Sequence, residues 1–541
     1  MTDADVDGEQ SLDAVTLEIL RNQFEGVAEE MGQVLVTGAY SPNIKERRDC
    51  STALFDADGR LVGQAEHIPV HLGAMPAAVD AVLAKDPEPG DVWVLNDPFQ
   101  GGTHLPDVTM VSPITTDDDA DDVLGYAVSR AHHADVGGQS PGSMPAGARE
   151  IYQEGLRLPP VRLVVDDEVN DDVMDVILAN VRNAGERKAD VRAQLAANDR
   201  AEDRVRDLVA EHGRDRIESA FDAVMAYSRD RITAELDALP DGEYHARDVL
   251  EGDGQTDEDV PIEATVTVDG AGVTVDFAGT ADQVDGNVNA PLAVATSAVY
   301  FVVRCVTDPD IPPNQGCYDP IHVHAPDGSL LNPSAPAAVV GGNVETSQRV
   351  TDVVLAAFAD AAPERIPAQG QGTMNNLVVG SRDADGFSYY ETIGGGAGGR
   401  PTGDGTDGVH VGMTNTLNTP VEALEAEYPL RVEAYGLRDG SGGDGEHRGG
   451  LGIVRSVTVE TDATVSLLTE RRRHPPKGVA GGDPGATGEN RIDDEDVPAK
   501  TTRDVPAGTT VTVRTPGGGG HGDPADRDEA ARELDRADDK V

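Results

Sequence analysis

The sequence predicts a multidomain α+β protein with mixed β-sheets, helical insertions and a glycine-rich, β-rich C-terminal part. Its 541 residues exceed what a single hydrophobic core ordinarily organises, so two to four domains are expected. Segments with helical spacing of apolar residues are interspersed with segments that alternate with a period of two. Glycine and short strand-like runs become dense between residues 370 and 470.

The first part of the chain has clear element signals. Apolar residues from Leu12 to Met31 recur at helical spacing, which predicts a helix over 11–38. Alternating runs around the turn residues ADG predict a hairpin at 50–64. A second helix at 70–83 and strands at 90–97, 108–114 and 123–132 follow.

The rest of the chain changes pattern several times. The acidic run TTDDDADD (115–122) predicts a solvated turn. Residues 170–237 carry opposite charges at four-residue spacing, which is typical of an exposed helical pair. Residues 242–280 alternate as antiparallel strands do, and 288–306 form an apolar helix.

These patterns give soft domain boundaries, because Pro and Gly are scattered rather than gathered into one linker. The last residues form a charged stub that is expected to fray. The predicted parts are an N-terminal metal-site α+β domain (1–165), a helical segment (166–240), an α+β middle domain (241–369), a glycine-rich β-rich domain (370–525) and a charged tail (526–541).

The composition excludes some functions. The net charge of −55 repels phosphate backbones, so nucleic-acid binding is not expected. Acidic residues spread along the whole chain fit a protein kept soluble in strong salt, as in a halophilic cytoplasm. No apolar run approaches 18 residues and the start lacks a signal-peptide pattern, so neither a membrane span nor secretion is expected. Three cysteines give no disulfide framework.

Two short signatures of the form His-x-x-Asp carry the strongest chemical signal. They are HLPD (104–107) and HHAD (132–135), each placed where a predicted strand meets a glycine-rich loop. Imidazole nitrogens and carboxylate oxygens together suit zinc, manganese or iron(II). The alternative is that these residues are polar loop tips that cap turns.

Other residues are weaker candidates. Asp49, beside Arg47 and Arg48, is a natural additional ligand, although such a group is more often a surface salt bridge. His67 and His71 are four residues apart, but Pro69 interrupts a helix there, which favours a role in lining the site over direct ligation.

The sequence shows no nucleotide site and no common nucleophile. The glycine-rich segments 394–400, 440–450 and 515–524 do not match a phosphate-binding loop. They predict tight turns in a β-rich domain or, alternatively, a backbone cradle for a substrate or a partner. No Gly-x-Ser-x-Gly elbow is present. Cys50 could be a nucleophile, although a lone Cys before a strand is more often packed.

The chain resembles the hydantoinase B/oxoprolinase family, which includes N-methylhydantoinase B-type subunits and is related to the alpha subunits of acetone-type carboxylases. The resemblance spans nearly the whole length. The segments that carry it include SPNIKERRDCSTALFDADGRLVGQAEHIPVHLGAMP, GDVWVLNDPFQGGTHLPDVTMVSPI, SRAHHADVGGQSPGSMP, VVGGNVETSQRVTDVV, GVHVGMTNTLNTPVEALE and TPGGGGHGDP.

This resemblance implies site residues and a partner. The metal ligands would be His104, Asp107 and His132, with Asp49 as the fourth candidate; His132 is favoured over His133 because the carboxylase relatives keep only the first histidine of the second signature. The ion would be a divalent metal such as Zn or Mn. A hydantoinase A-type partner would bind ATP in a hetero-oligomer.

The implied reaction is hydrolysis of a cyclic amide or imide, such as a hydantoin or 5-oxoproline, after the partner phosphorylates the amide oxygen. The metal would lower the pKa of a water, and Asp135 or His133 would act as general base. Two alternatives stay open: the alpha subunit of an acetone- or acetophenone-type ATP-dependent carboxylase, and a non-catalytic scaffold for the ATP-binding subunit.

Overall fold

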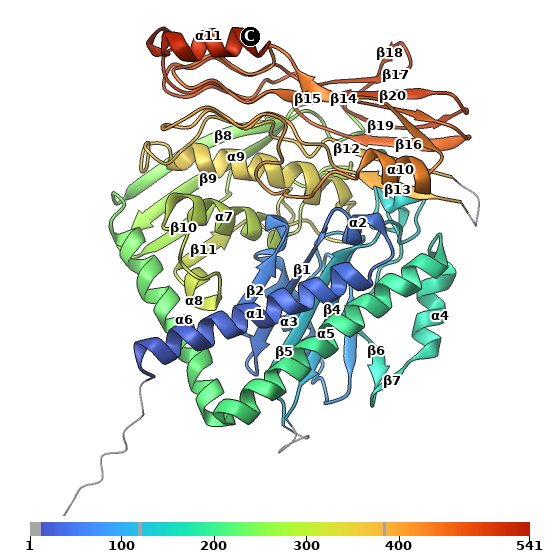
Figure 1. Cartoon of the computed structure of the whole chain (residues 1–541), viewed down its shortest axis with the longest axis vertical. Coiled ribbons are helices and arrows are strands. Elements are labelled where there is room, and N and C mark those ends of the chain that lie inside the picture. The colour runs from blue at the N-terminus through green and yellow to red at the C-terminus, as the bar shows by residue number, and fades with distance from the viewer. Residues whose placement is uncertain (1–11, 117–121, 382–385, 541) are drawn as a thin grey trace, which may run out of the picture.

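The computed structural model describes residues 12–116, 122–381 and 386–540 (Figure 1). The seven-stranded sheet lies at one end of the molecule, the C-terminal sheets lie at the other, and the helices α7 and α9 lie between them. Most of the acidic insertion at 115–122 lies outside the described residues. The α+β class is confirmed. The domain boundaries stay a prediction, and the largest buried cluster takes residues from Ala53 to Leu468.

The N-terminal part is a seven-stranded antiparallel sheet of order β2-β1-β5-β4-β3-β6-β7. The predicted hairpin and the three following strands are all present. Its strands are β1 (Cys50–Asp56), β2 (Leu61–Glu66), β3 (Val92–Leu95), β4 (Asp107–Ile114), β5 (Gly125–His132), β6 (Val161–Val165) and β7 (Glu168–Val169).

Helices cover the faces of this sheet. The predicted first helix is α1 (Ala14–Gly38), capped by the Asp13 carboxylate, which accepts hydrogen bonds from the backbone N–H groups of Val15 and Thr16. Its apolar residues at helical spacing are buried against β1, β2 and the long helix α5. The second predicted helix is α3 (Ala74–Leu83), preceded by the short turn η1 (Pro69–His71), and the short helix α2 (Pro42–Lys45) leads into β1.

The charged helical segment is less exposed than expected. It forms α4 (Asp171–Asn180), α5 (Ala184–His212) and α6 (Arg214–Asp237). Helix α5 lies across β4 and β5, where the buried Gln194 amide donates to Val108 O (3.0 Å) and the buried Asn198 amide to Ser112 Oγ (2.9 Å). The alternating charges therefore mark only the outer face of a helix that covers the sheet.

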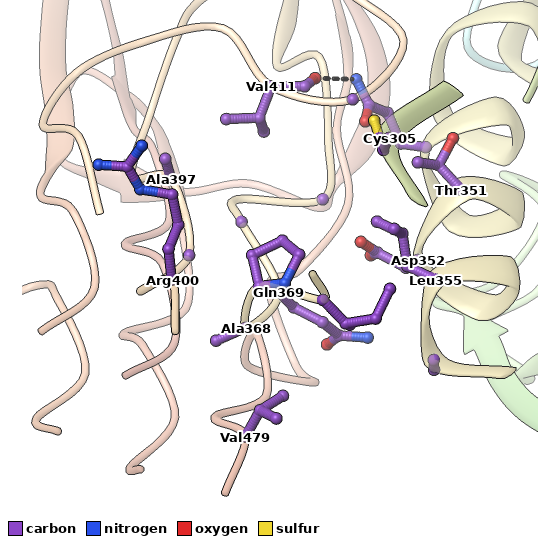
Figure 2. Close-up of a pocket in the computed structure, with 18 of the residues that line it drawn as sticks. Cys305, Thr351, Asp352, Leu355, Ala368, Gln369, Ala397, Arg400, Val411 and Val479 are labelled. Carbon is purple, nitrogen blue, oxygen red and sulfur yellow. Dashed lines mark hydrogen bonds between the residues drawn. The ribbon is translucent and has the colours of Figure 1, made fainter. Parts of the chain in front are cut away.

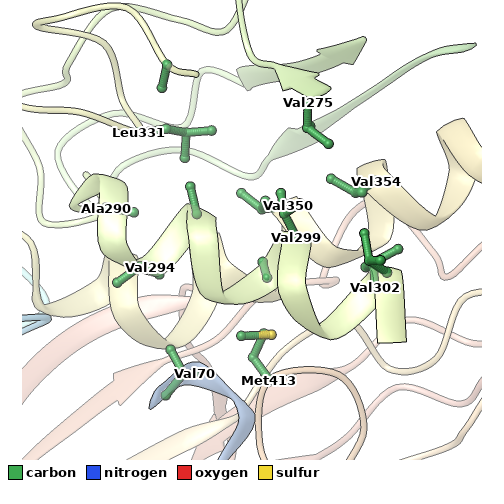
Figure 3. Close-up of a cluster of buried hydrophobic side chains, with 14 of the residues drawn as sticks. Val70, Val275, Ala290, Val294, Val299, Val302, Leu331, Val350, Val354 and Met413 are labelled. Carbon is green, nitrogen blue, oxygen red and sulfur yellow. The ribbon is translucent and has the colours of Figure 1, made fainter. Parts of the chain in front are cut away.

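The middle part combines a four-stranded sheet with an apolar helical layer. The sheet order is β11-β10-β9-β8, and valine side chains of the strands pack against α7 and α9 (Figure 3). The elements are β8 (Gly242–Leu250), β9 (Val260–Asp269), β10 (Gly272–Asp276), α7 (Leu292–Val306), α8 (Gln315–Tyr318), β11 (Ile321–His324), the π-helical turn η4 (Gly342–Thr346) and α9 (Ser347–Phe358). The short turns η2 (Pro141–Ser143) and η3 (Ile151–Gln153) lie earlier in the chain.

The C-terminal part contains two sheets, of order β13-β12-β16-β19 and β14-β15-β20-β17-β18. The elements are β12 (Asn376–Gly380), β13 (Ser388–Glu391), α10 (Val421–Glu427), β14 (Leu430–Arg438), β15 (Gly452–Val459), β16 (Ala463–Leu468), β17 (Glu489–Ile492), β18 (Glu495–Asp496), β19 (Lys500–Val505), β20 (Thr510–Arg514), η5 (Pro524–Asp526) and α11 (Glu529–Ala537).

The three glycine-rich segments are extended chains that pack side by side, not the tight turns expected from their composition. Gly396 N–H donates to Pro516 O (3.0 Å), Gly450 N–H to Ala397 O (2.7 Å) and Gly518 N–H to Gly450 O (2.9 Å). A Cβ added at Gly518 would lie 1.9 Å from Ala397 O. Glycine is therefore required here because the backbones touch.

The predicted fraying of the charged tail is also corrected. Residues 529–537 form α11, and its Asp535 is buried between two arginines, with contacts of 3.1 Å to Arg448 and 2.7 Å to Arg527. Within the described residues, no helix combines the length and apolar character needed to cross a membrane.

Candidate metal centre

Three predicted ligands converge at the edge of the seven-stranded sheet. Asp107 is the first residue of β4, and His132, the last residue of β5, is its direct partner across the strand pair. His104 lies on the turn just before β4. Potential ligand atoms of these residues all lie within 4.8 Å of one another. We call His104, Asp107 and His132 the His–Asp cluster.

The cluster centres on one carboxylate oxygen. Asp107 Oδ1 lies 2.9 Å from His104 Nε2 and 3.2 Å from His132 Nδ1. All three side chains are no more than 3% exposed. Two imidazole nitrogens and a carboxylate oxygen that face one another in a dry site form a donor set typical of zinc, manganese or iron(II).

Unpartnered nitrogens support this interpretation. In the part of the chain that the structure describes, neither ring nitrogen of His104 and not Nε2 of His132 makes a hydrogen bond of acceptable geometry. Buried polar atoms are rarely left in this state unless something else satisfies them. The residues present therefore fit a divalent metal ion, and the cluster could bind one.

The protonation of the cluster also suits ligation. Burial lowers the pKa of His104, which favours the neutral imidazole with a free lone pair. Burial acts to raise the pKa of Asp107, but His104 and the other neighbouring imidazoles outweigh it and hold that pKa well below its usual range. At neutral pH the cluster thus offers a carboxylate and a neutral imidazole.

The second oxygen of Asp107 is held by residues around the cluster. Thr103 Oγ1 donates to Asp107 Oδ2 (2.7 Å), and Asn343 Nδ2 approaches the same atom at 3.3 Å. His71 Nε2 lies 3.6 Å from this oxygen, and Ser51 Oγ lies 2.9 Å from His71 Nδ1. His71 therefore lines the site, as its sequence context favoured.

Asp49 has a different position from the three ligands. It precedes β1 and is buried, and its carbonyl accepts a hydrogen bond from His132 N (3.0 Å). Its carboxylate is not part of the compact group of ligand atoms, so its role as a fourth ligand stays a prediction. Arg47 turns away into the core, where it donates to Tyr390 O (2.6 Å) and Thr392 Oγ1 (2.5 Å).

The other two predicted catalytic residues contact different partners. Asp135 is fully buried and accepts from the backbone N–H groups of Gly137 (2.8 Å), Gly142 (2.9 Å) and Arg182 (3.1 Å), and it pairs with the Arg182 guanidinium (2.9 Å). His133 Nε2 lies 2.9 Å from Gln194 Oε1 on α5. Neither is brought into the His–Asp cluster.

A nucleophilic role for Cys50 is not supported. Its thiol is completely buried, and burial raises its pKa far above the usual range for a cysteine. A neutral thiol with no access to solvent is a poor nucleophile. The alternative, a packed core cysteine, is what the structure shows.

Sequence reasoning gave no role to two residues at this site, Asn343 of η4 and Tyr390 of β13. Tyr390 stacks on the His132 ring with centroids 4.6 Å apart and an interplanar angle of 16°. Both are more than 200 residues from the histidines in sequence, so only the segment VVGGNVETSQRVTDVV, already noted for its resemblance to a family, could have indicated Asn343.

A separate cavity of about 300 Å³ lies between α7, α9 and the glycine-rich segments (Figure 2). Its lining is mainly apolar, with Cys305, Leu355 and Val411 among the wall residues and Asp352 at one side. No residue of the His–Asp cluster lines it. This cavity is thus not the space in front of the cluster.

Comparison with known proteins now places the chain. Residues 13–524 match the sequence model described as Hydantoinase B/oxoprolinase. The chain belongs to the hydantoinase B/oxoprolinase family. The resemblance seen in the sequence is therefore confirmed.

Members of this family include relatives of two lengths. An uncharacterized protein of Methanocaldococcus jannaschii is 39% identical over 96% of this chain and 92% of its own length. A putative D-/L-hydantoinase B-type subunit of Pseudomonas sp. is 31% identical over 96% of this chain and 91% of its own length. The chain spans only 42% of 5-oxoprolinase 1 of Arabidopsis thaliana, to which it is 39% identical over 95% of its own residues.

Two solved structures share the fold of this hydantoinase B/oxoprolinase chain. The ATP-dependent caprolactamase from Pseudomonas jessenii superposes with a TM-score of 0.91 over 98% of this chain and 95% of that chain, at 28% identity. A nucleotide-free acetone carboxylase superposes with a TM-score of 0.87 over 98% of this chain and 78% of that chain, at 19% identity, and that likeness concerns the fold alone.

Proposed function

We propose that this chain is the metal-bearing subunit of an ATP-dependent enzyme that opens a cyclic amide or imide, such as a hydantoin or 5-oxoproline. The observation that carries the proposal is the buried His–Asp cluster, whose ring nitrogens lack other partners in the described residues. The names of the relatives, which are a 5-oxoprolinase, a hydantoinase and a caprolactamase, favour a ring amide as substrate.

The cluster would hold a divalent ion, zinc or manganese, through His104, Asp107 and His132, with Asp49 as a candidate fourth ligand. Such an ion supplies Lewis acidity and lowers the pKa of a water. The chain's own contribution is to keep the His104 imidazole neutral and Asp107 ionised, and to fix Asp107 through Thr103 and Asn343.

The proposed partner is an A-type subunit that recognises ATP and phosphorylates the amide oxygen. This chain shows no phosphate-binding loop. The long Arabidopsis relative, of which this chain spans 42%, supports the idea that a separate chain supplies the remaining part here. Phosphorylation would make an otherwise inert amide carbon electrophilic, which explains the need for ATP in a hydrolysis.

A general base is the least supported part of the mechanism. Asp135 and His133 remain the predicted candidates, but all contacts of Asp135 serve the loop at 137–142 and Arg182. These contacts favour a positioning role for Asp135, in which it shapes the loop that follows β5.

The first experiment is elemental analysis of the protein purified in high salt, beside a His104→Ala/His132→Ala variant. We expect about one zinc, manganese or iron per chain in the wild type and loss of metal in the variant. The matched control is His245→Ala/His322→Ala, which removes two exposed histidines of the middle sheet and should keep the metal. Equal metal in all three proteins, or none in any, would reject the site.

Activity then separates the proposed reaction from its alternatives. With the A-type partner and ATP, the wild type should open hydantoin or 5-oxoproline, and the His104→Ala/His132→Ala variant should not. ATP-dependent consumption of bicarbonate with acetone or acetophenone would instead identify a carboxylase alpha subunit. Full activity without metal would point to a scaffold for the partner.

A further inference from the structure

The ring of His132 is held in an unusual way for a metal ligand. A metal-binding histidine ordinarily donates its second ring N–H to a carboxylate, carbonyl or water, and that bond fixes the ring. In the described parts of the chain, Nε2 of His132 has no hydrogen-bond partner. What contacts the ring instead is the face of Tyr390, 4.6 Å away between centroids and nearly parallel.

Tyr390 is itself fixed on three sides. Its hydroxyl donates to Asn376 Oδ1 on the neighbouring strand β12 (2.9 Å). The Arg47 guanidinium lies 5.2 Å from the ring centroid and donates to the Tyr390 carbonyl (2.6 Å). The side chain is buried, so it has little freedom to rotate away from His132.

The chain of contacts continues to a buried carboxyl group. Asn376 Nδ2 donates to Glu345 Oε1 (2.8 Å) and to Leu468 O (2.8 Å), which fixes the orientation of the amide. Met374 N–H also donates to Glu345 Oε1 (3.1 Å). Burial and then the charge of Glu470 raise the pKa of Glu345 to about 8, so the group is a neutral acceptor near pH 7.

The same short segment reaches the cluster twice. Glu345 belongs to η4, and Asn343 of that turn approaches Asp107 Oδ2 at 3.3 Å. π-Helical turns occur disproportionately at functional sites. The turn therefore contacts Asp107 directly and His132 through Asn376 and Tyr390.

We propose that Tyr390 is a positioning residue that sets the ring plane of His132, with Asn376 and Glu345 holding Tyr390 in place. This inference rests on the proposed metal site. Stacking restrains the ring plane without using a ring nitrogen, so both nitrogens of His132 stay free. Loss of the Tyr390 ring should then weaken and distort metal binding even though no ligand is removed.

The test uses Co²⁺ as a spectroscopic probe in the metal-depleted full chain. We expect Tyr390→Leu to weaken Co²⁺ binding about 10–100-fold, as loss of residues that orient ligands does elsewhere, and to shift the visible absorption bands. Tyr390→Phe keeps the stacked ring and loses only the bond to Asn376, so its affinity should fall less than that of Tyr390→Leu and its bands should stay close to those of the wild type.

The matched control is Tyr389→Leu. Tyr389 is the adjacent residue on β13 and equally buried, but it packs in the C-terminal core. We expect this variant to lose stability with an unchanged Co²⁺ spectrum. If Tyr390→Leu bound Co²⁺ as the wild type does, or if Tyr389→Leu and Tyr390→Leu perturbed the spectrum alike, the positioning role would be wrong.

The same titration distinguishes this inference from the proposed function. A wild-type protein that binds no Co²⁺ would reject the metal site, and the role of Tyr390 with it. A wild type that binds Co²⁺ tightly beside an unaffected Tyr390→Leu would reject only the positioning role and leave the proposed function in place.

Discussion

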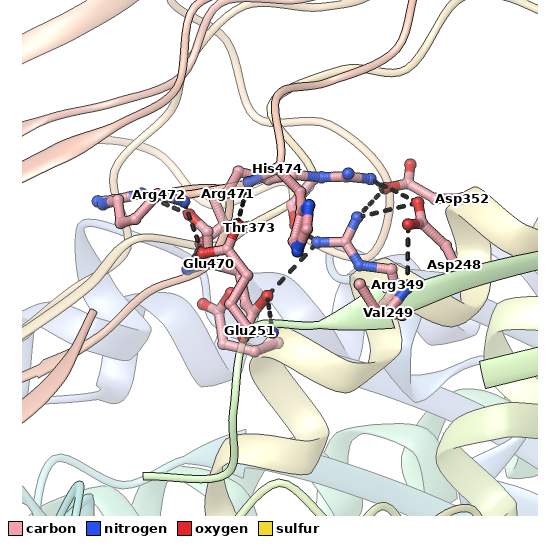
Figure 4. A network of polar contacts seen from close by, with 12 residues as sticks. Asp248, Val249, Glu251, Arg349, Asp352, Thr373, Glu470, Arg471, Arg472 and His474 are labelled. Atoms are coloured by element: carbon pink, nitrogen blue, oxygen red, sulfur yellow. Dashed lines mark hydrogen bonds and ion pairs between the residues drawn. The ribbon is translucent and has the colours of Figure 1, made fainter. Parts of the chain in front are cut away.

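Two buried polar groups lie near each other along η4 and α9, and they differ in how their charges are matched. In the ion network, formed by Asp248, Arg349, Asp352, Glu470 and Arg471, every carboxylate faces a cation (Figure 4). In the His–Asp cluster, one carboxylate faces two imidazoles whose nitrogens have spare capacity. Burial of charge therefore does not identify a binding site by itself, whereas unmatched donor atoms do.

The ion network has a structural task. Asp248 lies near the end of β8, Arg349 and Asp352 lie on α9, and Glu470 and Arg471 follow β16, so the network joins the middle and C-terminal sheets. Asp352 also borders the apolar cavity, and burial raises its pKa to about 7. Paired charges here connect layers of the fold, while the cluster at the edge of the first sheet is left to bind.

The largest expected effect comes from breaking the ion network. Arg349→Met leaves Asp248, Asp352 and Glu470 short of one cation, and removal of one partner from a buried ion pair costs about 3–5 kcal/mol of unfolding free energy. Chemical denaturation at constant salt measures the loss. The control, Arg491→Met, removes an exposed arginine 2.8 Å from Asp496 and should cost about 0–1 kcal/mol. Similar losses in both variants would remove the distinction drawn above.

An intermediate effect is expected at Asp135, which lies beside the cluster but makes contacts like those of the ion network. Asp135→Asn replaces one acceptor oxygen with an amide that meets N–H groups, so we expect a loss of about 1–3 kcal/mol. Metal content should stay at the wild-type level, since Asp135 is not among the converging ligands. Normal stability with abolished ring opening would instead support Asp135 as the general base.

The smallest expected effect concerns Glu154, a buried carboxyl group whose hydrogen bonds come from the backbone. It accepts from the N–H groups of Val339 and Val340, and burial raises its pKa to about 8. The folded state thus keeps a proton that the unfolded chain loses near its ordinary pKa of 4.5. Stability from this group is complete at low pH and falls as the pH rises through about 8.

Glu154→Gln tests this expectation, because its amide oxygen can still accept both backbone bonds. Between pH 5 and pH 9, the wild type should lose more unfolding free energy than the variant, by at least the ~1.4 kcal/mol that one unit of pKa shift represents. Glu345 and Asp352 titrate in both proteins, so their contributions cancel in the difference. Parallel stability curves would show that Glu154 is ionised in the fold.

The sequence predicted what depends on local pattern. Spacing of apolar residues located α1, α3 and α7, and alternation located the strands of the first sheet. The two His-x-x-Asp signatures pointed to the cluster, because each lies at a strand end and the pairing of Asp107 with His132 brings the ends together. The signatures could not show that only the first contributes its aspartate to this group, since Asp135 lies beyond the strand, where the chain turns back toward Arg182.

Contacts between distant segments were beyond local patterns. Nothing in the residues around 343 or 390 shows that they meet residues 107 and 132, because that meeting depends on how the middle and C-terminal layers stack on the first sheet. The charges of α5 suggested exposure, yet its buried Gln194 and Asn198 face β4 and β5. The glycine-rich segments looked like turns because composition does not report close packing between backbones.

Those packed glycine segments also constrain how the gene can vary. Every amino-acid replacement reached from a glycine codon by one nucleotide change adds a Cβ, and at Gly396 or Gly518 that atom would fall 2.0 or 1.9 Å from a neighbouring carbonyl oxygen. Only silent changes at the third codon position avoid the clash. A stretch that reads as low in information should therefore be among the slowest parts of this gene to diverge, although it contributes no side chain to the chemistry.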